Sequence, residues 1–342
     1  MSVTALLFSG AAEEWDRFVR SQSGWTHFHL YGWRRVFESV FGHECFYFEA
    51  RDEAGSLVGV LPLVRVRSVL FGHYLVSVPF LNYGGPLGSA DAVRALAASA
   101  EALARKDGVK LLELRSRQEL PLDMPVSHRK VTVVLDLPSG DPAKLMKSFD
   151  AKLRSQVRRP QKEGITVRFG PDQVAPFFEV FARHMRDLGT PTQPKRLFET
   201  IAEVFPDAWF GCAWLGDQPV AGGAGFVWGS EFEMTWASSL YSYNRLSPNM
   251  GLYWAFMERA VNEGLTLFNF GRCTPGAGTH RFKRQWGSRD EQLWWYQLTP
   301  AGEPAATPSP DDSAYSWGPR LWRRLPLGLA TALGPRIVRS IP

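Results

Sequence analysis

The hydrophobic pattern of the chain follows the same order of helices and strands twice. The first copy is predicted to contain a helix at 33–41, strands at 45–50 and 57–66, a helix at 92–106 and a strand at 109–114. The second copy is predicted to contain a helix at 196–205, strands at 209–215 and 220–227, a helix at 250–263 and a strand at 265–270. The predicted helices carry one apolar stripe, and the strands are almost continuously apolar, as in sheets covered by helices. The pattern therefore predicts an α/β protein with two mixed sheets, one in each half.

Changes in composition divide the chain into four predicted parts. Residues 1–140 and 141–298 each hold one copy of the repeat. Residues 299–319 are rich in proline, alanine, serine, threonine and aspartate, which is typical of a flexible linker. Residues 320–342 form a basic and apolar tail with five arginines and no acid. This composition favours either an anionic membrane surface or docking on the body of the protein, and the prolines of the tail argue against one long helix.

Overall composition limits the classes of partner and the compartment. The chain has 342 residues and a formal net charge of +5, which favours anionic partners such as phosphates, RNA or an anionic membrane surface. Its cysteines, Cys45, Cys212 and Cys273, are isolated, so we expect free thiols in a reducing cytoplasm. Neither a signal peptide nor a membrane-spanning stretch is predicted. His27 and His29 alternate without a third ligand, so no metal site is predicted.

The segment 247–287 carries the strongest functional signal. Ser247 is predicted to cap a helix that begins at Pro248, and the buried strand 265–270 follows it. The strand leads into a basic, glycine-rich loop over 271–287 that has no acidic residue. The cations of this loop and two of its glycines are Arg272, Gly276, Gly278, Arg281, Lys283 and Arg284. Because ligands of α/β sheets bind at strand ends, and arginine and lysine bind phosphate or carboxylate, the loop is predicted to bind an anionic group.

A second basic stretch, 144–168, lies between the two copies. If 145–161 forms one helix, Lys147, Arg154 and Arg158 share one side of it. These side chains are interpreted either as a grip on a phosphate or RNA backbone or as a solvated helix face, and the sequence favours neither.

With these parts assembled, the chain resembles the FemAB-like acyltransferase family, whose members carry two tandem domains of the GNAT fold, that of the N-acetyltransferases. The resemblance covers roughly residues 20–298 and is most specific in the run Ser247-x-Asn249, Phe268-x-Phe270-Gly271-Arg272, Gly276-x-Gly278-Thr279-His280-Arg281-Phe282-Lys283 and Trp286-Gly287. The run looks most like the branch of the family associated with exosortase (PEP-CTERM) and exopolysaccharide systems. The tail from Trp322 to Pro335 is also similar to that branch.

The resemblance implies amide-bond formation in envelope or exopolysaccharide biosynthesis. Family members transfer an aminoacyl group from aminoacyl-tRNA to an amine of a cell-wall precursor, without a covalent enzyme intermediate. By this resemblance, the catalytic pair is Phe282 and Lys283, and Lys283 stabilises charge on the carbonyl oxygen. Together with the basic stretch, the residues expected to bind an anionic or lipid-linked substrate are Arg154, Arg158, Asn249, Arg272, Gly276, Gly278 and Arg281. No cofactor is expected, because the activated acyl donor is a co-substrate.

Two departures from the family pattern bear on the donor. The glycine-rich pyrophosphate loop of acetyl-CoA-dependent GNAT enzymes is missing at 244–249, which disfavours acetyl-CoA but leaves other acyl-CoA donors open. The RNA-contacting coiled coil of the family is not visible, which leaves the tRNA donor open as well. Cys273 beside Arg272 could be an activated thiolate, but the spacing implies no partnered histidine, which disfavours nucleophilic catalysis. For His280, a loop hydrogen bond is favoured over a role as a base or ligand. The alternatives to an aminoacyl transferase are therefore an acyl-CoA-dependent N-acyltransferase and a non-catalytic, membrane-attached accessory protein on the inner face of the membrane.

Overall fold

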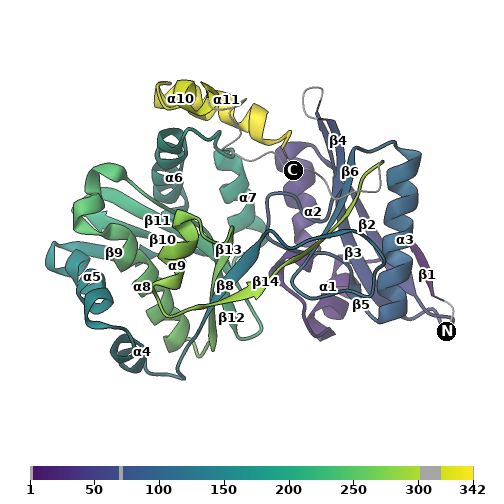
Figure 1. Ribbon diagram of the computed structural model, residues 1–342, viewed down its shortest axis with the longest axis horizontal. Coiled ribbons are helices and arrows are strands. Elements are labelled where there is room, and N and C mark those ends of the chain that lie inside the picture. Colours follow the sequence, from purple (N-terminus) through teal and green to yellow (C-terminus); the bar gives the residue numbers. More distant parts are fainter. Residues whose placement is uncertain (1–2, 69–71, 301–316, 342) are drawn as a thin grey trace. The chain divides into compact units, whose positions relative to one another are not determined.

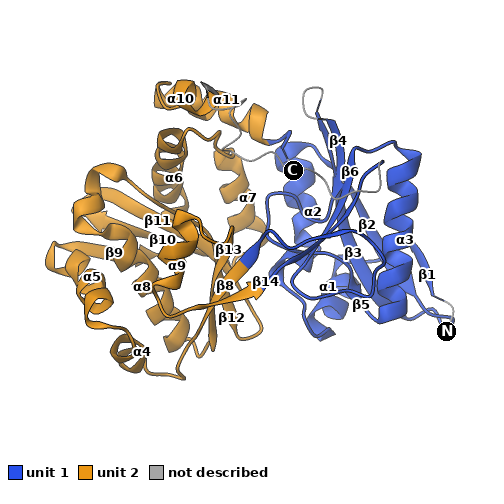
Figure 2. Ribbon diagram, viewed as in Figure 1, with its two compact units in different colours: residues 1–131, 292–307, 339–342 blue, residues 132–291, 308–338 orange. Residues whose placement is uncertain are grey.

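The computed structural model describes residues 3–68, 72–300 and 317–341. The chain forms two compact units (Figure 2). Unit 1 comprises residues 1–131, 292–307 and 339–342, and unit 2 comprises residues 132–291 and 308–338. Most of the predicted linker 299–319 lies outside the described residues.

Unit 1 is built on a mixed sheet with the strand order β1-β2-β3-β4-β6-β15-β7, in which β5 also pairs with β3 (Figure 1). Its strands are β1 (Thr4–Leu7), β2 (Glu44–Arg51), β3 (Leu57–Ser68), β4 (Gly72–Val76), β5 (Leu87–Gly88), β6 (Leu111–Ser116), β7 (Val126–Ser127) and β15 (Trp294–Leu298). Its helices are α1 (Ala12–Ser21), α2 (Gly32–Val36) and α3 (Ala90–Lys106), with short helical turns at His27–His29 and Phe37–Phe41. The apolar stripe of α3, which includes Leu96 and Ala100, is buried against sheet residues such as Leu61 and Leu112.

Unit 2 is built on a second mixed sheet with the strand order β14-β8-β13-β12-β11-β10-β9. Its strands are β8 (Val131–Asp136), β9 (Ile165–Phe169), β10 (Trp209–Leu215), β11 (Gln218–Trp228), β12 (Glu231–Ser239), β13 (Leu267–Cys273) and β14 (Arg289–Gln292). Its helices are α4 (Pro142–Ser148), α5 (Ala151–Lys162), α6 (Val174–Leu188), α7 (Lys195–Val204), α8 (Pro248–Asn262), α9 (Gly278–Arg284), α10 (Trp317–Trp322) and α11 (Leu327–Val338), with turns at Pro171–Gln173 and Tyr241–Leu246. The predicted α/β class with one mixed sheet in each copy is confirmed.

The two sheets exchange strands along the chain. β15 follows the second copy in sequence but pairs with β6 and β7 of unit 1. β8 follows the first copy but lies beside β13 in the sheet of unit 2. The ranges 1–140 and 141–298 therefore stay a prediction about the sequence copies, whereas the compact units cross those limits.

Each unit contains a short parallel pairing next to antiparallel ones. In unit 1, Tyr74–Val76 of β4 pairs with Leu111–Glu113 of β6. In unit 2, Glu231–Glu233 of β12 pairs with Leu267–Asn269 of β13. These pairings end at equivalent positions, because the two copies are offset by 156 residues at this point of the sequence.

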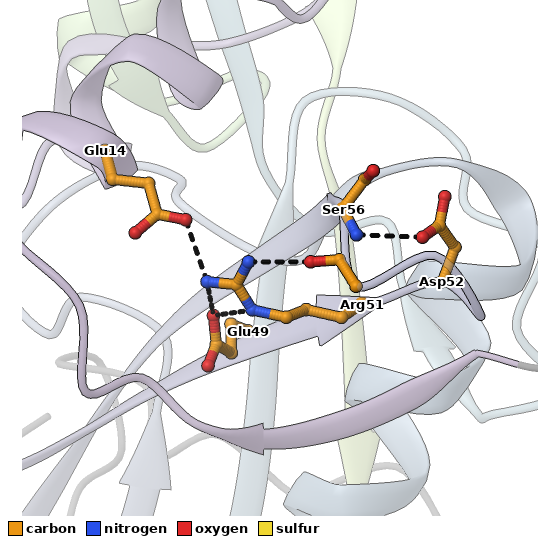
Figure 3. Close-up of polar contacts among 6 residues, drawn as sticks. Glu14, Glu49, Arg51, Asp52 and Ser56 are labelled. Carbon is orange, nitrogen blue, oxygen red and sulfur yellow. Dashed lines mark hydrogen bonds and ion pairs between the residues drawn. The ribbon is translucent and has the colours of Figure 1, made fainter.

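The turn predicted at 52–56 joins β2 to β3 and is held by polar contacts (Figure 3). The side chain of Asp52 accepts a hydrogen bond from the backbone N–H of Ser56 at 2.8 Å. Arg51 donates to Glu49 of β2 and to Glu14 of α1, each at 2.8 Å. Because the side chains of Arg51 and Glu14 are about one-third exposed, we expect these contacts to fix the turn rather than to add much stability.

Two consecutive glycines of β11 allow helices to approach the sheet of unit 2 on both faces. A Cβ on Gly222 would lie 3.1 Å from the ring of Phe177 in α6, and a Cβ on Gly223 would lie 3.1 Å from the ring of Phe256 in α8. Successive strand residues face opposite sides. α6 and α8 therefore cover opposite faces, and α8 leads directly into β13.

Two local predictions in unit 2 are wrong, and one condition considered in the sequence analysis is not met. Ser247 precedes α8 but makes no capping hydrogen bond, because its φ of 56° is left-handed and a capping side chain needs an extended backbone. The condition considered for 145–161, one continuous helix, is not met: the segment holds two helices, since Asp150 starts α5 by accepting from the backbone N–H of Leu153 at 2.7 Å. The loop predicted at 271–287 contains the end of β13 and the whole of α9.

The tail packs on unit 2. α10 and α11 contact α6 (Figure 1), and a guanidinium nitrogen of Arg186 donates to the carbonyl of Leu325 at 3.2 Å. This is docking on the body of the protein, one of the two interpretations of the tail sequence. In the described part of the chain, every helix is too short or too polar to cross a membrane.

Candidate active site

Lys283 lies on α9, directly after the end of β13. Its side chain is buried, and its ammonium donates to the backbone carbonyls of Gly271 at 2.8 Å and of Arg272 at 2.9 Å. Successive carbonyls of a strand normally point to opposite sides, and the φ of 73° at Gly271 breaks that alternation. Within the described residues these two carbonyls are its hydrogen-bond acceptors, and the third N–H of the ammonium donates to neither of them.

Burial lowers the pKa of Lys283 from 10.5 to about 8. Loss of hydration is the main cause, because it disfavours the ammonium form. Cys273 and Glu233 raise the pKa in part, and Arg272 lowers it further. At neutral pH Lys283 is therefore mostly cationic but titrates close to the physiological range, as suits a group that stabilises a developing negative charge.

A buried polar cluster lies behind the carbonyls that hold Lys283. The side-chain amide of Asn269 donates to Glu231 at 2.7 Å and to Glu233 at 3.2 Å. Its oxygen accepts from the hydroxyl of Thr132 at 2.6 Å and from the backbone N–H of Gly271 at 2.8 Å. Asn269 and Glu233 are fully buried. Asn269 thus links two buried acids to the same peptide segment whose carbonyls bind the lysine.

Sequence reasoning missed this cluster. The available signal was a pair of acids two residues apart in the apolar run 231–239, and one asparagine within the apolar run 265–270. Acids are seldom buried without partners, so both features indicate a polar contact inside the sheet. Only the parallel pairing of β12 with β13 brings Glu233 beside Asn269.

Phe282 and Trp286 form an aromatic group around the lysine helix. The ring of Phe282 meets Tyr253 edge-on at 5.1 Å and Trp286 at 6.5 Å. Trp286 is fully buried and also packs on Phe149 at 5.5 Å. These contacts give Phe282 a packing role that fixes α9. Its predicted part in catalysis with Lys283 stays a prediction.

The other predicted residues of this segment surround the turn before α9. Arg281 is exposed and donates to the carbonyl of Gly276 at 2.7 Å, while the backbone N–H of Gly276 donates to His280 at 3.1 Å. His280 also pairs with Asp290 at 2.9 Å. Arg272 is half-buried beside Lys283, and the exposed Gly278 begins α9. His280 is therefore held by a loop hydrogen bond and by Asp290, which favours a structural role over a role as a catalytic base.

Of the predicted residues outside this segment, Arg154 lies nearest to the aromatic group. Its guanidinium donates to the carbonyl of Phe149, whose ring packs on Trp286. Arg158 is exposed one turn further along α5, and Lys147 belongs to the separate helix α4. A groove of about 610 Å³ runs between α5, β9 and α8. Lys283 does not line this groove, so the groove is separate from the lysine.

Asn249 is half-buried in the first turn of α8. The next residue, Met250, accepts a weak hydrogen bond from Gln285 at 3.8 Å, which brings the start of α8 close to the end of α9. Cys273 is buried at the end of β13. The structure therefore brings Asn249, Arg272, Cys273 and Lys283 into one region of unit 2.

The histidines of the first half do not form a site of this kind. His27 and His29 are both buried, and loss of hydration lowers the pKa of His27 to about 3 and of His29 to about 4. A ring nitrogen of His29 lies 3.1 Å from the carbonyl of Gly85. No group of three or more histidine, cysteine, aspartate or glutamate side chains in the described residues could hold a metal ion.

Comparison with known proteins identifies the fold. Residues 147–284 match the family model described as an acetyltransferase (GNAT) domain. No curated protein matches the chain. Three solved structures are similar to it over most of their length. FemX is 16 % identical with a TM-score of 0.65, covering 87 % of this chain and 98 % of its own. L-PGS from Bacillus licheniformis is 12 % identical with a TM-score of 0.58, covering 97 % of both chains.

The third is a tandem GNAT protein from the clavulanic acid biosynthesis pathway. It is 13 % identical with a TM-score of 0.53, covering 89 % of this chain and all of its own. At these identities the likeness concerns the fold. This chain therefore has a tandem GNAT-like fold, and its residues 147–284 match an acetyltransferase (GNAT) domain.

Proposed function

We propose that this protein is an N-acyltransferase that joins an activated acyl group to an amine in cell-envelope or exopolysaccharide biosynthesis. One observation carries the proposal: Lys283 is buried, is held by two neutral carbonyls and has a third N–H that donates to neither of them. A cation placed in this way is suited to the negative charge that forms on a carbonyl oxygen during acyl transfer.

The chemistry requires positioning and charge stabilisation. The acceptor nitrogen bonds to the carbonyl carbon of the donor, and the carbon–oxygen or carbon–sulfur bond to the leaving group then breaks. The amine loses a proton, and the leaving alcohol or thiol gains one. The ammonium of Lys283 stabilises the oxyanion between these steps, and Arg272 and Arg281 bind anionic parts of the substrates.

We favour an aminoacyl donor carried by tRNA, with a lipid-linked or anionic amine as acceptor. The fold likeness to FemX and to the C-terminal domain of a putative lysylphosphatidylglycerol synthetase from Agrobacterium fabrum supports this choice. The basic residues Arg154 and Arg158 of α5 would contact the donor phosphates. The association with exosortase (PEP-CTERM) systems rests on the sequence resemblance, and a cytoplasmic location rests on the isolated cysteines; both are part of the same proposal.

A second donor class, acyl-CoA, is favoured by the match to the acetyltransferase (GNAT) domain model. The two donors share the reaction of the amine with an activated carbonyl and differ only in the leaving group. A direct assay therefore separates them.

The assay compares labelled aminoacyl-tRNA with labelled acyl-CoA. The purified full chain is incubated with each donor and an extract of envelope precursors, and label that resists mild alkali is counted, because amides survive where esters hydrolyse. We expect transfer from aminoacyl-tRNA that falls about 10²–10³-fold in Lys283→Ala. The matched control, Lys195→Ala at an exposed position of α7, should transfer at the wild-type rate.

Transfer from acyl-CoA alone would contradict the proposed aminoacyl donor but would still support the proposed acyltransferase activity. Transfer that is equal in wild type and Lys283→Ala would contradict the catalytic role of Lys283. If a folded wild-type protein transferred from neither donor, the non-catalytic accessory role would replace the proposal.

A further inference from the structure

The described part of the tail exposes large apolar side chains. Leu321, Leu329 and Leu333 are 58 %, 54 % and 41 % exposed. Half of the large hydrophobic side chains exposed by the described residues lie between residues 317 and 341. Such a concentration in a short segment indicates an interaction surface rather than scattered exposure.

The orientation of α11 is fixed by small residues on its inner face. Ala330 is 1 % exposed, and a Cβ on Gly334 would lie 2.8 Å from the backbone nitrogen of Thr192. Leu329 lies one position before Ala330, and Leu333 lies one position before Gly334. The two leucines are one helical turn apart, as are the two small residues. The tight contact at Gly334 therefore holds the two leucines outward.

Polar contacts at the start of the tail extend the same surface to α6. Arg323 donates to the carbonyl of Leu188 at 3.3 Å, and the side chain of Leu188 is itself 39 % exposed. Arg186 donates to the carbonyl of Leu325. The exposed leucines of the tail and of α6 thus belong to one anchored surface of unit 2.

Arginines accompany these leucines. Arg320, Arg323, Arg324 and Arg336 are exposed, and the described tail contains no acidic residue. Arginine alone suits any anion, including an RNA backbone, but phosphates give no reason for exposed leucines. The interface of an anionic bilayer accepts both, since its headgroups attract arginine and its acyl boundary buries leucine.

We propose that α10, α11 and the end of α6 form a docking surface for an anionic lipid membrane. α11 lies on this membrane with Leu329 and Leu333 in the headgroup region and does not cross it. Binding here is separable from the proposed catalysis, because Lys283 is not part of the surface.

Vesicle flotation of the full chain tests this surface. We expect binding to phosphatidylcholine vesicles that contain phosphatidylglycerol, no binding to pure phosphatidylcholine, and loss of binding at high salt. The variant Arg320→Gln/Arg324→Gln should bind about ten- to thirtyfold more weakly. Leu329→Ser/Leu333→Ser should bind at least about tenfold more weakly, because it removes the inserted apolar groups.

Matched controls come from unit 1. Leu6→Ser/Leu7→Ser replaces leucines that are 57 % and 55 % exposed, and Arg94→Gln/Arg105→Gln removes the same net charge as the tail variant. Both controls, and Lys283→Ala, should float like wild type. Equal flotation of tail variants and controls would overturn the proposal. It would also be overturned if only the arginine variant lost binding and free tRNA displaced the protein, since the surface would then be one for RNA.

Discussion

The parallel strand pairings of the two units end at equivalent positions but use them differently. In unit 1, the carbonyl of Arg115 accepts the backbone N–H groups of Gly84 at 3.1 Å and of Gly85 at 2.7 Å. In unit 2, the equivalent carbonyl belongs to Gly271 and accepts a hydrogen bond from the ammonium of Lys283 at 2.8 Å. The carbonyl at the first strand end is bound by the backbone of a loop, whereas the carbonyl at the second binds a cation.

The buried acids of the two units differ in the same way. In unit 1, Glu113 pairs with Arg115 at 2.7 Å and accepts from Gln297 at 2.7 Å, so acid and cation neutralise each other on one strand. In unit 2, the position of Glu113 is taken by Asn269, and that of Arg115 by Gly271. The acids stand on the neighbouring strand, and the cation arrives from α9.

This difference explains why one unit is expected to carry the chemistry. A guanidinium paired with a buried carboxylate has no net charge to offer a substrate. An ammonium held by neutral carbonyls keeps its charge, although burial makes that charge costly. The comparison therefore predicts that Arg115 supports folding and that Lys283 supports catalysis.

The largest expected effect is on stability in unit 1. Arg115→Met leaves Glu113 buried without its cation and also removes a hydrogen bond to the carbonyl of Leu81. We expect the free energy of unfolding to fall by about 3–5 kcal/mol, measured by urea titration of the full chain. Below the unfolding transition, turnover should stay within about threefold of wild type. A folded Arg115→Met protein with turnover as low as that of Lys283→Met would contradict the comparison.

The next effect is on turnover in unit 2. Lys283→Met keeps the length and apolar character of the side chain but removes the charge, and we expect kcat to fall about 10²–10³-fold. Lys283→Arg retains the charge with a different geometry, so it should recover part of the rate. A rate for Lys283→Met within tenfold of wild type would show that the carbonyl-bound ammonium does not stabilise the reaction.

The third effect is the pH dependence of stability. The pKa of Lys283 falls on folding from 10.5 to about 8, so the folded state bears the cost of a buried ammonium below pH 8. Between these values the folded lysine is neutral while the unfolded one stays charged, so the unfolded state binds more protons and stability rises with pH. The unfolding free energy of wild type minus that of Lys283→Met should therefore rise by about 3 kcal/mol across this window and be flat below it.

Catalysis should respond in the opposite direction over the same window. If the ammonium form is the active one, kcat/KM falls as pH rises through about 8, and Lys283→Arg removes that decline. A rate that increased through this pKa in wild type alone would make Lys283 a base and not a charge stabiliser.

The sequence predicted the order of elements because helices and strands have local periodicities. The helix 250–263 and the strand 265–270 lie within one continuous segment, so the local hydrophobic pattern is sufficient to predict them. The sequence predicts a loop where α9 forms, since the seven residues of α9 include a glycine and three cations and leave too few apolar positions to show a stripe.

Contacts between distant segments could not be predicted in this way. Thr132 and Asn269 are 137 residues apart and meet because β8 joins the sheet of unit 2. Gln297 and Glu113 are 184 residues apart and meet because β15 joins the sheet of unit 1. Pairing of this kind depends on sheet topology, which hydrophobic periodicity in one sequence does not specify.

The smallest effect expected is that of Asn269, and it sharpens the comparison most. Asn269→Ala removes the acceptor of the Gly271 N–H and the donor to Glu231 and Glu233, so we expect a loss of about 1–3 kcal/mol in unfolding free energy. The matched control in unit 1 is Gln297→Ala, which removes an equally buried donor to Glu113 at a similar cost.

The two variants should separate in kinetics. Asn269→Ala frees the peptide whose carbonyls hold Lys283, so it should lower kcat about tenfold and shift the alkaline limb of the pH profile, whereas Gln297→Ala should change neither. A positioning role for Asn269 requires that shift, because mere destabilisation would lower the amount of folded protein without moving a pKa. If both variants lowered kcat equally at the same folded fraction, the strand ends of both units would contribute to catalysis. The proposed difference between the two units would then be wrong.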